Sequence, residues 1–235
     1  MKTLQAFSWI FLLGCAASLG ACDAEQPLPQ CTVGRGEHAV RYTLVSGIGS
    51  CAAKRAEKLG AQIFRTPGSG EPPSLVFKPG PFAANEGKDP AHPVLSTGNF
   101  TTEYPSKDEV CEVPTLSEAR QFVAQATGTP VDVRYQWSNV RVQGSSAIPG
   151  TQWIADLTYS EDDCTATYVA VGLFPALKCE RTEVRNGQNV VVRDPAICSL
   201  PRPSLSIDPA FPTLCDEGTN LCVLDGEPPA LLPQP

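Results

Sequence analysis

The chain has 235 residues, of which 42% are hydrophobic, and its formal net charge is -7 at pH 7. This length suffices for one sizeable hydrophobic core. The acidic balance and the lack of a lysine- or arginine-rich run argue against binding to nucleic acid and against electrostatic adhesion to anionic lipid.

The first 21 residues have the anatomy of an export signal. Lys2 precedes an apolar run over residues 6–13, which is too short for a membrane-spanning helix, and small residues follow it. The tetrapeptide LGAC at residues 19–22 resembles the lipobox of bacterial lipoproteins. This resemblance implies cleavage after Ala21 and acylation of Cys22, which would anchor the protein in a membrane.

The number of cysteines separates this interpretation from two alternatives, a second lipobox-like site that ends at Cys15 and ordinary cleavage near residues 16–18. Acylation of Cys22 with loss of Cys15 leaves eight cysteines, whereas either alternative leaves an odd thiol, which exported proteins usually avoid. The eight candidates for disulfides are Cys31, Cys51, Cys111, Cys164, Cys179, Cys198, Cys215 and Cys222. Because no C-x-x-C pair occurs, disulfides in a periplasm or at a cell surface are favoured over a zinc site.

We expect these cysteines to pair with their neighbours in the sequence, although the sequence alone does not fix the connectivity. The expected bonds are Cys31–Cys51, Cys111–Cys164, Cys179–Cys198 and Cys215–Cys222. The last bond is the best supported, because the turn-rich residues 216–220 would close a small loop.

The sequence predicts four consecutive regions. They are a signal peptide at residues 1–21, an acylated tether at 22–30, a single disulfide-rich mainly-β domain at 31–225 and a flexible tail at 226–235. The tether is proline-containing and reaches at most about 28 Å, which keeps the folded domain close to the lipid surface.

In the first part of the domain, residues 37–46 alternate apolar and polar side chains and predict a half-buried strand. A glycine turn at 47–49 follows, then an alanine- and lysine-rich stretch at 50–59 that predicts a short helix, and a short returning strand at 62–65. Residues 67–93 are rich in proline and glycine, which predicts an irregular connection with one strand at 75–77.

A capping box begins at Thr115 and predicts a helix that stops at Gly128, with a strand over 121–126 as the alternative. After it, strand-like alternation covers residues 131–142 and 153–159, with a phase shift at Ser138 and Asn139 that predicts a bulge. Residues 165–174 are apolar on both faces and predict a buried strand. Asn186 and Gly187 predict a hairpin turn between two further strands. The fold class that follows is mainly β, an antiparallel, disulfide-braced, sandwich-like domain with one or two short helices.

Motifs with recognisable chemistry are few. Residues 47–52 match the dinucleotide fingerprint G-x-G-x-x-A, but no further βα units follow, so a tight glycine turn is favoured. His38 and His92 belong to no H-E-x-x-H pattern, and solvated histidines are favoured over a catalytic site. We expect no cofactor and no bound metal.

Two acidic turns, at residues 161–163 and 216–220, carry oxygen ligands of the kind that calcium binds, but neither fits the EF-hand loop. Acidic side chains that bond the local backbone are the favoured interpretation. Four aromatic residues lie in phase with the apolar side of their strands, so core packing is favoured over a sugar-binding face. They are Tyr135, Trp137, Trp153 and Tyr159.

The segment GTQWIADLTY at residues 150–159 before an acidic turn, FPTLCD at 211–216 and LCV at 221–223, taken with the lipobox, are similar to myxobacterial outer-membrane lipoproteins of the Mlp type. That resemblance implies lipid anchoring in the cell envelope, with the outer membrane favoured over the inner. Asp23, directly after Cys22, is an inner-membrane retention signal in enteric bacteria, so the sequence does not decide between the inner and the outer membrane. The family offers no catalytic residue to carry over.

We therefore expect a lipid-anchored envelope protein with a non-catalytic binding or structural role, whose partners are the membrane and an envelope protein or glycan, not nucleic acid. One alternative is an anchored hydrolase of envelope polymers with a site in the loop at 66–110, which requires a close pair of buried titratable groups in a cleft. The other is a calcium-dependent adhesive module, which requires melting that depends on calcium.

Overall fold

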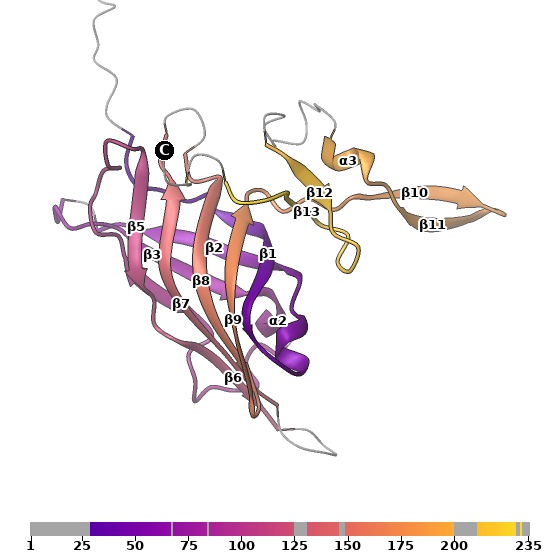
Figure 1. Ribbon diagram of the computed structural model, residues 1–235, viewed down its shortest axis with the longest axis horizontal. Helices are drawn as coiled ribbons and strands as arrows, with labels where there is room; N and C mark the ends of the chain where they lie inside the picture. The colour runs from indigo at the N-terminus through magenta and orange to yellow at the C-terminus, as the bar shows by residue number, and fades with distance from the viewer. Residues whose placement is uncertain are drawn as a thin grey trace, which may run out of the picture.

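An antiparallel sheet of nine strands forms the body of the described part of the protein (Figure 1). The computed structural model describes residues 29–66, 68–83, 85–124, 131–145, 149–199, 211–228 and 231. The strands of the body are β1 Gly36–Gly47, β2 Ala56–Phe64, β3 Ser74–Pro79, β4 Ser96–Asn99, β5 Val110–Thr115, β6 Ala119–Val123, β7 Val131–Gln143, β8 Gln152–Glu161 and β9 Cys164–Leu173. Two helical turns lie between strands, η2 at Ser50–Ala53 and α2 at Gly80–Ala83.

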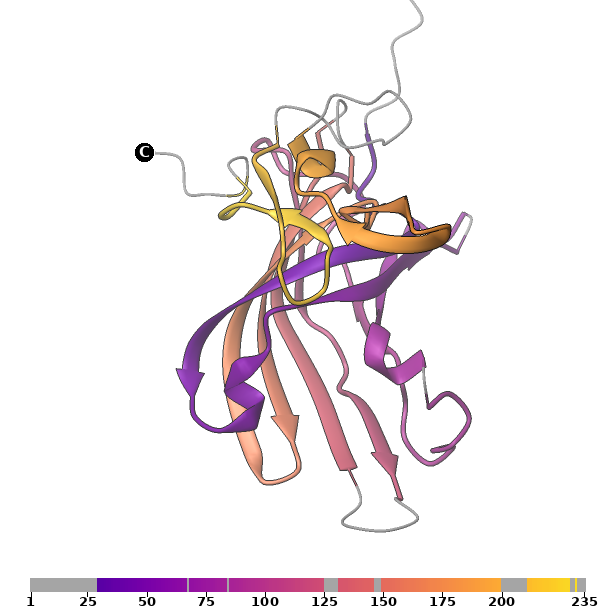
Figure 2. The same cartoon turned by 90° about the vertical axis from the view of Figure 1, so that its right-hand side faces the viewer.

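The strand order is β4-β3-β2-β1-β9-β8-β7-β5, and β6 pairs with the first half of β7. The sheet curls until its two ends meet, since the Thr101 N–H after β4 donates to the Glu112 carbonyl of β5 at 2.9 Å. The two halves of one sheet therefore face each other across a common core (Figure 2). The predicted class, mainly antiparallel β with disulfides and short helices, is confirmed, with one curled sheet providing both layers.

Aromatic side chains fill the core between the two halves. The rings of Trp137 and Trp153 meet edge to face with centroids 6.0 Å apart, and Phe77 packs 4.8 Å from Trp153. Gly172 lies opposite Trp153 in the β8–β9 register, and a Cβ at this glycine would be 2.0 Å from the indole. The four aromatic residues interpreted as core are all buried, so that prediction is confirmed.

Local turn chemistry follows the predictions in two places. The β7–β8 register shifts between Ser138 and Arg141, where Asn139 has a φ of 50°, so the predicted bulge is confirmed. Asn186 and Gly187 have φ values of 52° and 77° and form the predicted hairpin turn. Both positions need the left-handed region, which asparagine and glycine tolerate best.

Both predicted helices are wrong. Residues 50–59 form only the η2 turn before β2 begins, because β2 has a pairing partner on each side, β1 and β3. Residues 119–123 form β6, which overlaps the alternative strand predicted at 121–126. This segment is a strand because it pairs with β7 and buries Ala119 and Gln121. In both segments long-range strand pairing outweighs a helix propensity worth tenths of a kcal/mol per residue.

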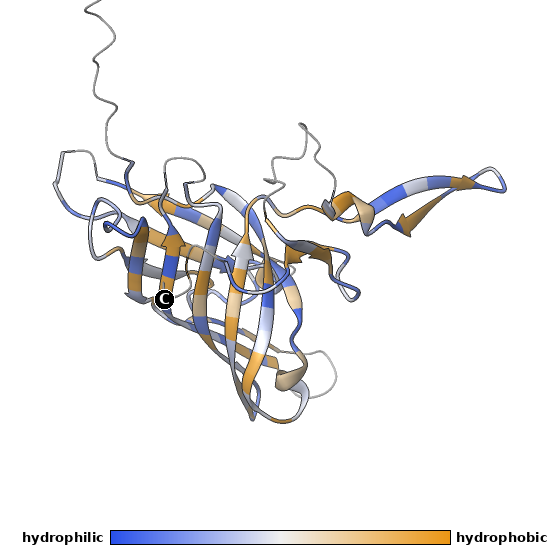
Figure 3. Cartoon of the chain, turned by 45° about the horizontal axis from the view of Figure 1, so that its top comes forward, coloured by the Kyte–Doolittle hydropathy of each residue, from blue (hydrophilic) through white to orange (hydrophobic). Residues whose placement is uncertain are grey.

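A smaller unit, which we call the cysteine lobe, comprises residues 176–199 and 211–228. It contains β10 Glu180–Arg185, β11 Gln188–Arg193, α3 Ala196–Ser199, β12 Thr213–Cys215 and β13 Cys222–Leu224. The β10–β11 hairpin projects away from the sheet (Figures 1 and 3), and its Val184 and Val191 are 72% and 62% exposed. None of the helices in the described ranges has the length and hydrophobicity needed to cross a membrane.

Four disulfides brace the described residues, and the predicted pairing of neighbours is wrong at every bond. The sheet contains Cys31–Cys111 and Cys51–Cys164, and the lobe contains Cys179–Cys215 and Cys198–Cys222. Cys31 and Cys111 are 80 positions apart and meet because the curled sheet brings the segment before β1 to β5. Cys51 and Cys164 are 113 positions apart and meet because β1 and β9 are paired strands. Cys215 and Cys222 do lie opposite each other in the β12–β13 register, but each is bonded to a cysteine of another element.

His38 is a core residue, so the expectation of a solvated histidine is wrong for this position. Its Nε2–H donates to the Gly34 carbonyl at 2.8 Å, and its Nδ1 accepts from the Trp153 Nε1–H at 3.1 Å. Burial lowers its pKa from 6.5 to about 4, against a smaller opposing effect of the Gly34 hydrogen bond. A second proton would point Nδ1–H at the indole N–H, so the folded state favours neutral imidazole.

We expect the stability of the protein to fall as the pH drops from 6.5 towards 4. The folded pKa lies below the unfolded one, so protons bind the unfolded state first, and the stability present above pH 6.5 is lost through this window. Between pH 7 and 5 the loss is about 2 kcal/mol, measurable by urea unfolding. His38→Gln, which does not titrate, should reduce this pH dependence. A wild-type stability that is the same at pH 7 and pH 5 would contradict the prediction.

Candidate functional site

A groove of about 460 Å³ lies on the outer face of the sheet and is lined by residues of β5, β7, β8 and β9. These four strands lie side by side in the sheet (Figure 1). We call it the outer-face groove and define it by its polar residues Glu112, Asn139, Arg141, Asp156 and Glu227, with Pro114, Ile154 and Val169 among its apolar ones. Glu112, Arg141 and Ile154 come together because they are successive partners in the register of β5, β7 and β8. The bulge at Asn139 interrupts the β7–β8 ladder beside them.

The charge of the outer-face groove is predominantly negative, with three carboxylates and one guanidinium. Asp156 accepts a hydrogen bond from Asn139 Nδ2 at 2.6 Å. The exposed carboxylates of Glu112 and Glu227 make no hydrogen bond or ion pair with any residue that the structure describes. They are therefore free to bind a cationic group of a ligand.

One end of the outer-face groove is covered by the chain itself. Leu231 is 3% exposed and packs in an apolar cluster with Ile154, Val171, Leu173 and Leu224. Its carbonyl accepts a hydrogen bond of 3.0 Å from Arg141 Nη1. Leu231 lies within the segment predicted to be a flexible tail, and it is buried against the sheet.

A second polar cluster lies in the core, and sequence analysis did not anticipate it. We call it the tyrosine cage, formed by Tyr42, Lys54, Glu57, Tyr135 and Tyr159. Lys54 Nζ lies 2.5 Å from Glu57 Oε2 and 2.6 Å from Tyr135 Oη. The same ammonium lies 4.9, 4.7 and 4.7 Å from the ring centroids of the three tyrosines, within cation–π range.

The electrostatics of the tyrosine cage keep its phenols neutral. Burial raises the pKa of Tyr42 and Tyr135 well above 10, and the charge of Glu57 adds to the effect. Burial likewise raises the pKa of Tyr159, which also donates to Glu161 at 2.9 Å. Lys54 and Glu57 thus neutralise each other among neutral rings.

The outer-face groove, a second hollow and the tyrosine cage can be compared with what the hydrolase alternative requires. That alternative needs paired titratable groups in the loop at 66–110, but the close buried pair Lys54 and Glu57 lies at η2 and β2. A second hollow of about 320 Å³ does involve this loop, and Glu71 is its one carboxylate. The loop also contains one close titratable pair, His92 and Asp89 at 2.9 Å, but neither residue is among the described residues that line this hollow or the outer-face groove.

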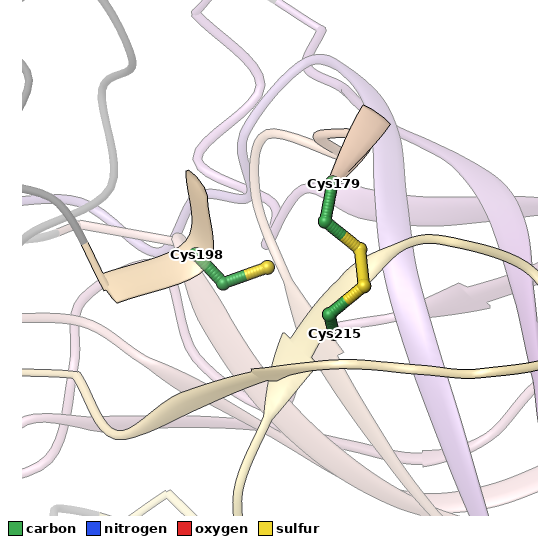
Figure 4. A group of neighbouring side chains, drawn as sticks. All are labelled: Cys179, Cys198 and Cys215. Carbon is green, nitrogen blue, oxygen red and sulfur yellow. A yellow bond between two sulfur atoms is a disulfide. The ribbon is translucent and has the colours of Figure 1, made fainter. Parts of the chain in front are cut away.

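The lobe cysteines form the one group of described residues close enough to ligate a metal ion. The Sγ atoms of Cys179, Cys198 and Cys215 all lie within 4.8 Å of one another (Figure 4). All three are committed to disulfides, and Arg193 Nε donates to Cys215 Sγ at 3.1 Å. Metal binding requires thiolates, so these sulfurs act as cross-links while the bonds persist.

The two acidic turns differ in how their side chains are bonded. Asp216 Oδ1 accepts from the backbone N–H groups of Gly218 and Thr219, the local bonding favoured from sequence. Asp162 Oδ1 instead accepts from the N–H of Asp132, 30 positions earlier in the chain, at 2.8 Å. Among the described residues, neither turn belongs to a group of three or more His, Cys, Asp or Glu side chains close enough to hold a metal ion.

The remaining predicted residues divide into three groups. His92 lies 2.9 Å from Asp89 in an ion-pair geometry outside the groove and the cage. The glycines at 47 and 49 have φ values of 127° and 86°, in keeping with a tight turn. Ala21 and Cys22 lie outside the described residues.

Comparison with known proteins yields two similarities. The family model MlpA matches residues 36–175, which is the curled sheet. The chain is also 25% identical over 238 residues to a Myxococcus xanthus protein named as a lipoprotein, MlpA, and the alignment covers 94% of this chain and 95% of that protein. No solved structure matches the chain.

Proposed function

The chain belongs to the MlpA family, and from this premise we propose that it is a lipid-anchored, non-enzymatic binding protein of the outer membrane. Three observations support anchoring in the envelope. The related Myxococcus xanthus protein is named as a lipoprotein, residues 19–22 resemble a lipobox, and four disulfides suit an oxidising compartment.

The outer-face groove is the observation that carries the binding function. It is concave, it combines an apolar floor with ionised groups, and two of its carboxylates have no partner among the described residues. Its volume falls within the range of about 300–1,000 Å³ typical of ligand sites. The tyrosine cage, in contrast, satisfies its own charges and supports the fold.

Anchoring is tested by Cys22→Ser. We expect this change to move the protein from the membrane fraction to the soluble fraction and to abolish incorporation of labelled palmitate, since the thioether-linked lipid would be lost. Cys15→Ser, inside the signal segment, should change neither result. Retention of an acylated Cys22→Ser protein in membranes would refute the assignment, and density-gradient separation of the two membranes tests the outer-membrane location.

Binding is tested by photo-crosslinking in intact cells. A benzophenone side chain at the exposed Pro114, which lines the outer-face groove, should give discrete adducts, whereas the same side chain at Gln188, on the projecting hairpin, should give none. Equal adducts at both positions, or none at Pro114, would contradict a binding role for this groove.

A further inference from the structure

The segment that covers one end of the outer-face groove indicates what kind of ligand the groove accepts. Leu231 supplies an apolar side chain and a main-chain carbonyl. The side chain belongs to the apolar cluster with Ile154 and Val171, and the carbonyl accepts a hydrogen bond from Arg141. An extended peptide that contains an apolar residue offers these same two groups. Leu231 therefore marks one position at which a peptide residue fits the groove.

The rest of the outer-face groove specifies the charge of the ligand. Arg141 and Ile154 both contact Leu231 and line the groove, so the open volume continues from the Leu231 position. Beyond it lie Glu112, Asp156 and Glu227, and the carboxylates of Glu112 and Glu227 have no partner among the residues described. A lysine or arginine side chain placed there would neutralise them.

We propose that the outer-face groove binds an extended peptide segment in which an apolar residue is followed by basic ones, and that Leu231 competes for its apolar end. This inference rests on the binding function proposed above and names its ligand class. The acidic net charge of the chain, -7, would attract such a segment from a distance.

Other ligand classes fit the outer-face groove less well. Glycan sites commonly offer an aromatic face for stacking, and no lining residue of this groove is aromatic. An anionic ligand would meet three carboxylates, and a simple amine would leave the apolar position beside Ile154 unused. An extended basic peptide uses the apolar floor, Arg141 and the carboxylates together.

The test uses detergent-solubilised full-length protein and two fluorescein-labelled hexapeptides, one with two leucines followed by four lysines and the other with two leucines followed by four glutamates. Fluorescence anisotropy should show binding of the lysine peptide and not of the glutamate peptide. Raising the salt from about 0.05 to about 0.5 M should weaken that binding, since exposed charges are screened. Equal binding of both peptides would overturn the proposal.

Three variants locate the binding. The double change Glu112→Gln and Glu227→Gln should weaken binding of the lysine peptide about tenfold, while the fold is kept because neither carboxylate has an internal partner. Glu217→Gln, at the tip of the β12–β13 turn, is the matched control and should change nothing. Leu231→Ala should tighten binding about threefold, because it weakens the internal competitor.

The outcomes distinguish a failure of this inference from a failure of the proposed binding function. If adducts form at Pro114 in cells but the lysine peptide does not bind, the peptide class is wrong and the binding function stands. If neither cross-linked adducts nor binding of the lysine peptide is observed, both the peptide inference and the binding function are refuted. Binding that is indifferent to the double glutamine change would place the peptide elsewhere and overturn the inference.

Discussion

Glu57→Gln is expected to lower the free energy of unfolding by about 3–5 kcal/mol, because it leaves a buried ammonium without its counter-ion. The side chains of Lys54 and Glu57 are 12% and 9% exposed, so water compensates little for the lost carboxylate. The Tyr135 hydroxyl and three aromatic rings would remain around Lys54, and their cation–π contacts offset only part of the loss.

The paired variant Lys54→Met with Glu57→Gln provides the control. It removes both charges and keeps the volume, and such replacements are often neutral or stabilising. Urea unfolding of the wild type, the single variant and the paired variant should therefore place the single variant lowest. If the single and paired variants were equally destabilised, the loss would come from packing and the electrostatic account would be wrong.

Removal of one disulfide of the cysteine lobe, by Cys179→Ser with Cys215→Ser, is expected to unfold the β10–β11 hairpin and leave the sheet intact. The cluster at the base of the hairpin consists of the four lobe cysteines with Leu177 and Ile197 packed against them. The β13 segment, in contrast, is also held to the sheet by apolar side chains, Leu221, Val223 and Leu224. The bond closes a separation of 36 residues, which is worth about 4 kcal/mol on the chain-entropy account.

Hydrogen–deuterium exchange measures this local unfolding directly. Amides of β10 and β11 should lose protection, because a two-stranded hairpin without support is marginally stable, while β7 and β8 keep theirs. The control is Cys51→Ser with Cys164→Ser, which removes a bond of the sheet and should leave the hairpin protected. A hairpin that stays protected without Cys179–Cys215 would show that other contacts support the lobe.

Segments with strong alternation were predictable from sequence. β1, β7 and β8 have apolar side chains at every second position, β9 is apolar on both faces, and the Asn186-Gly187 turn fixes its own hairpin. The stretch at 50–59 was not predictable locally, since its alanines and its Lys54–Glu57 spacing suit a helix. Pairing of β2 with two distant strands decides its structure.

The candidate site was almost invisible in the sequence for the same reason. Glu112, Arg141 and Ile154 become neighbours only through the register of three strands, and no local pattern encodes that register. The disulfides illustrate the point again, because sequence parity identified the cysteines, but strand pairing and the curl of the sheet determine which cysteines of the sheet meet. The prediction that Cys22 is acylated, in contrast, rests on a local sequence motif and does not depend on the fold.

The bond between Cys31 and Cys111 gives the molecule a mechanical role. Cys31 is the first cysteine after the predicted anchor at Cys22, and Cys111 immediately precedes Glu112 in the outer-face groove. Tension between a membrane lipid and a ligand in the groove would therefore run through this one covalent bridge. The 80 positions that it spans, about 270 Å of extensible chain, carry no load while the bridge holds.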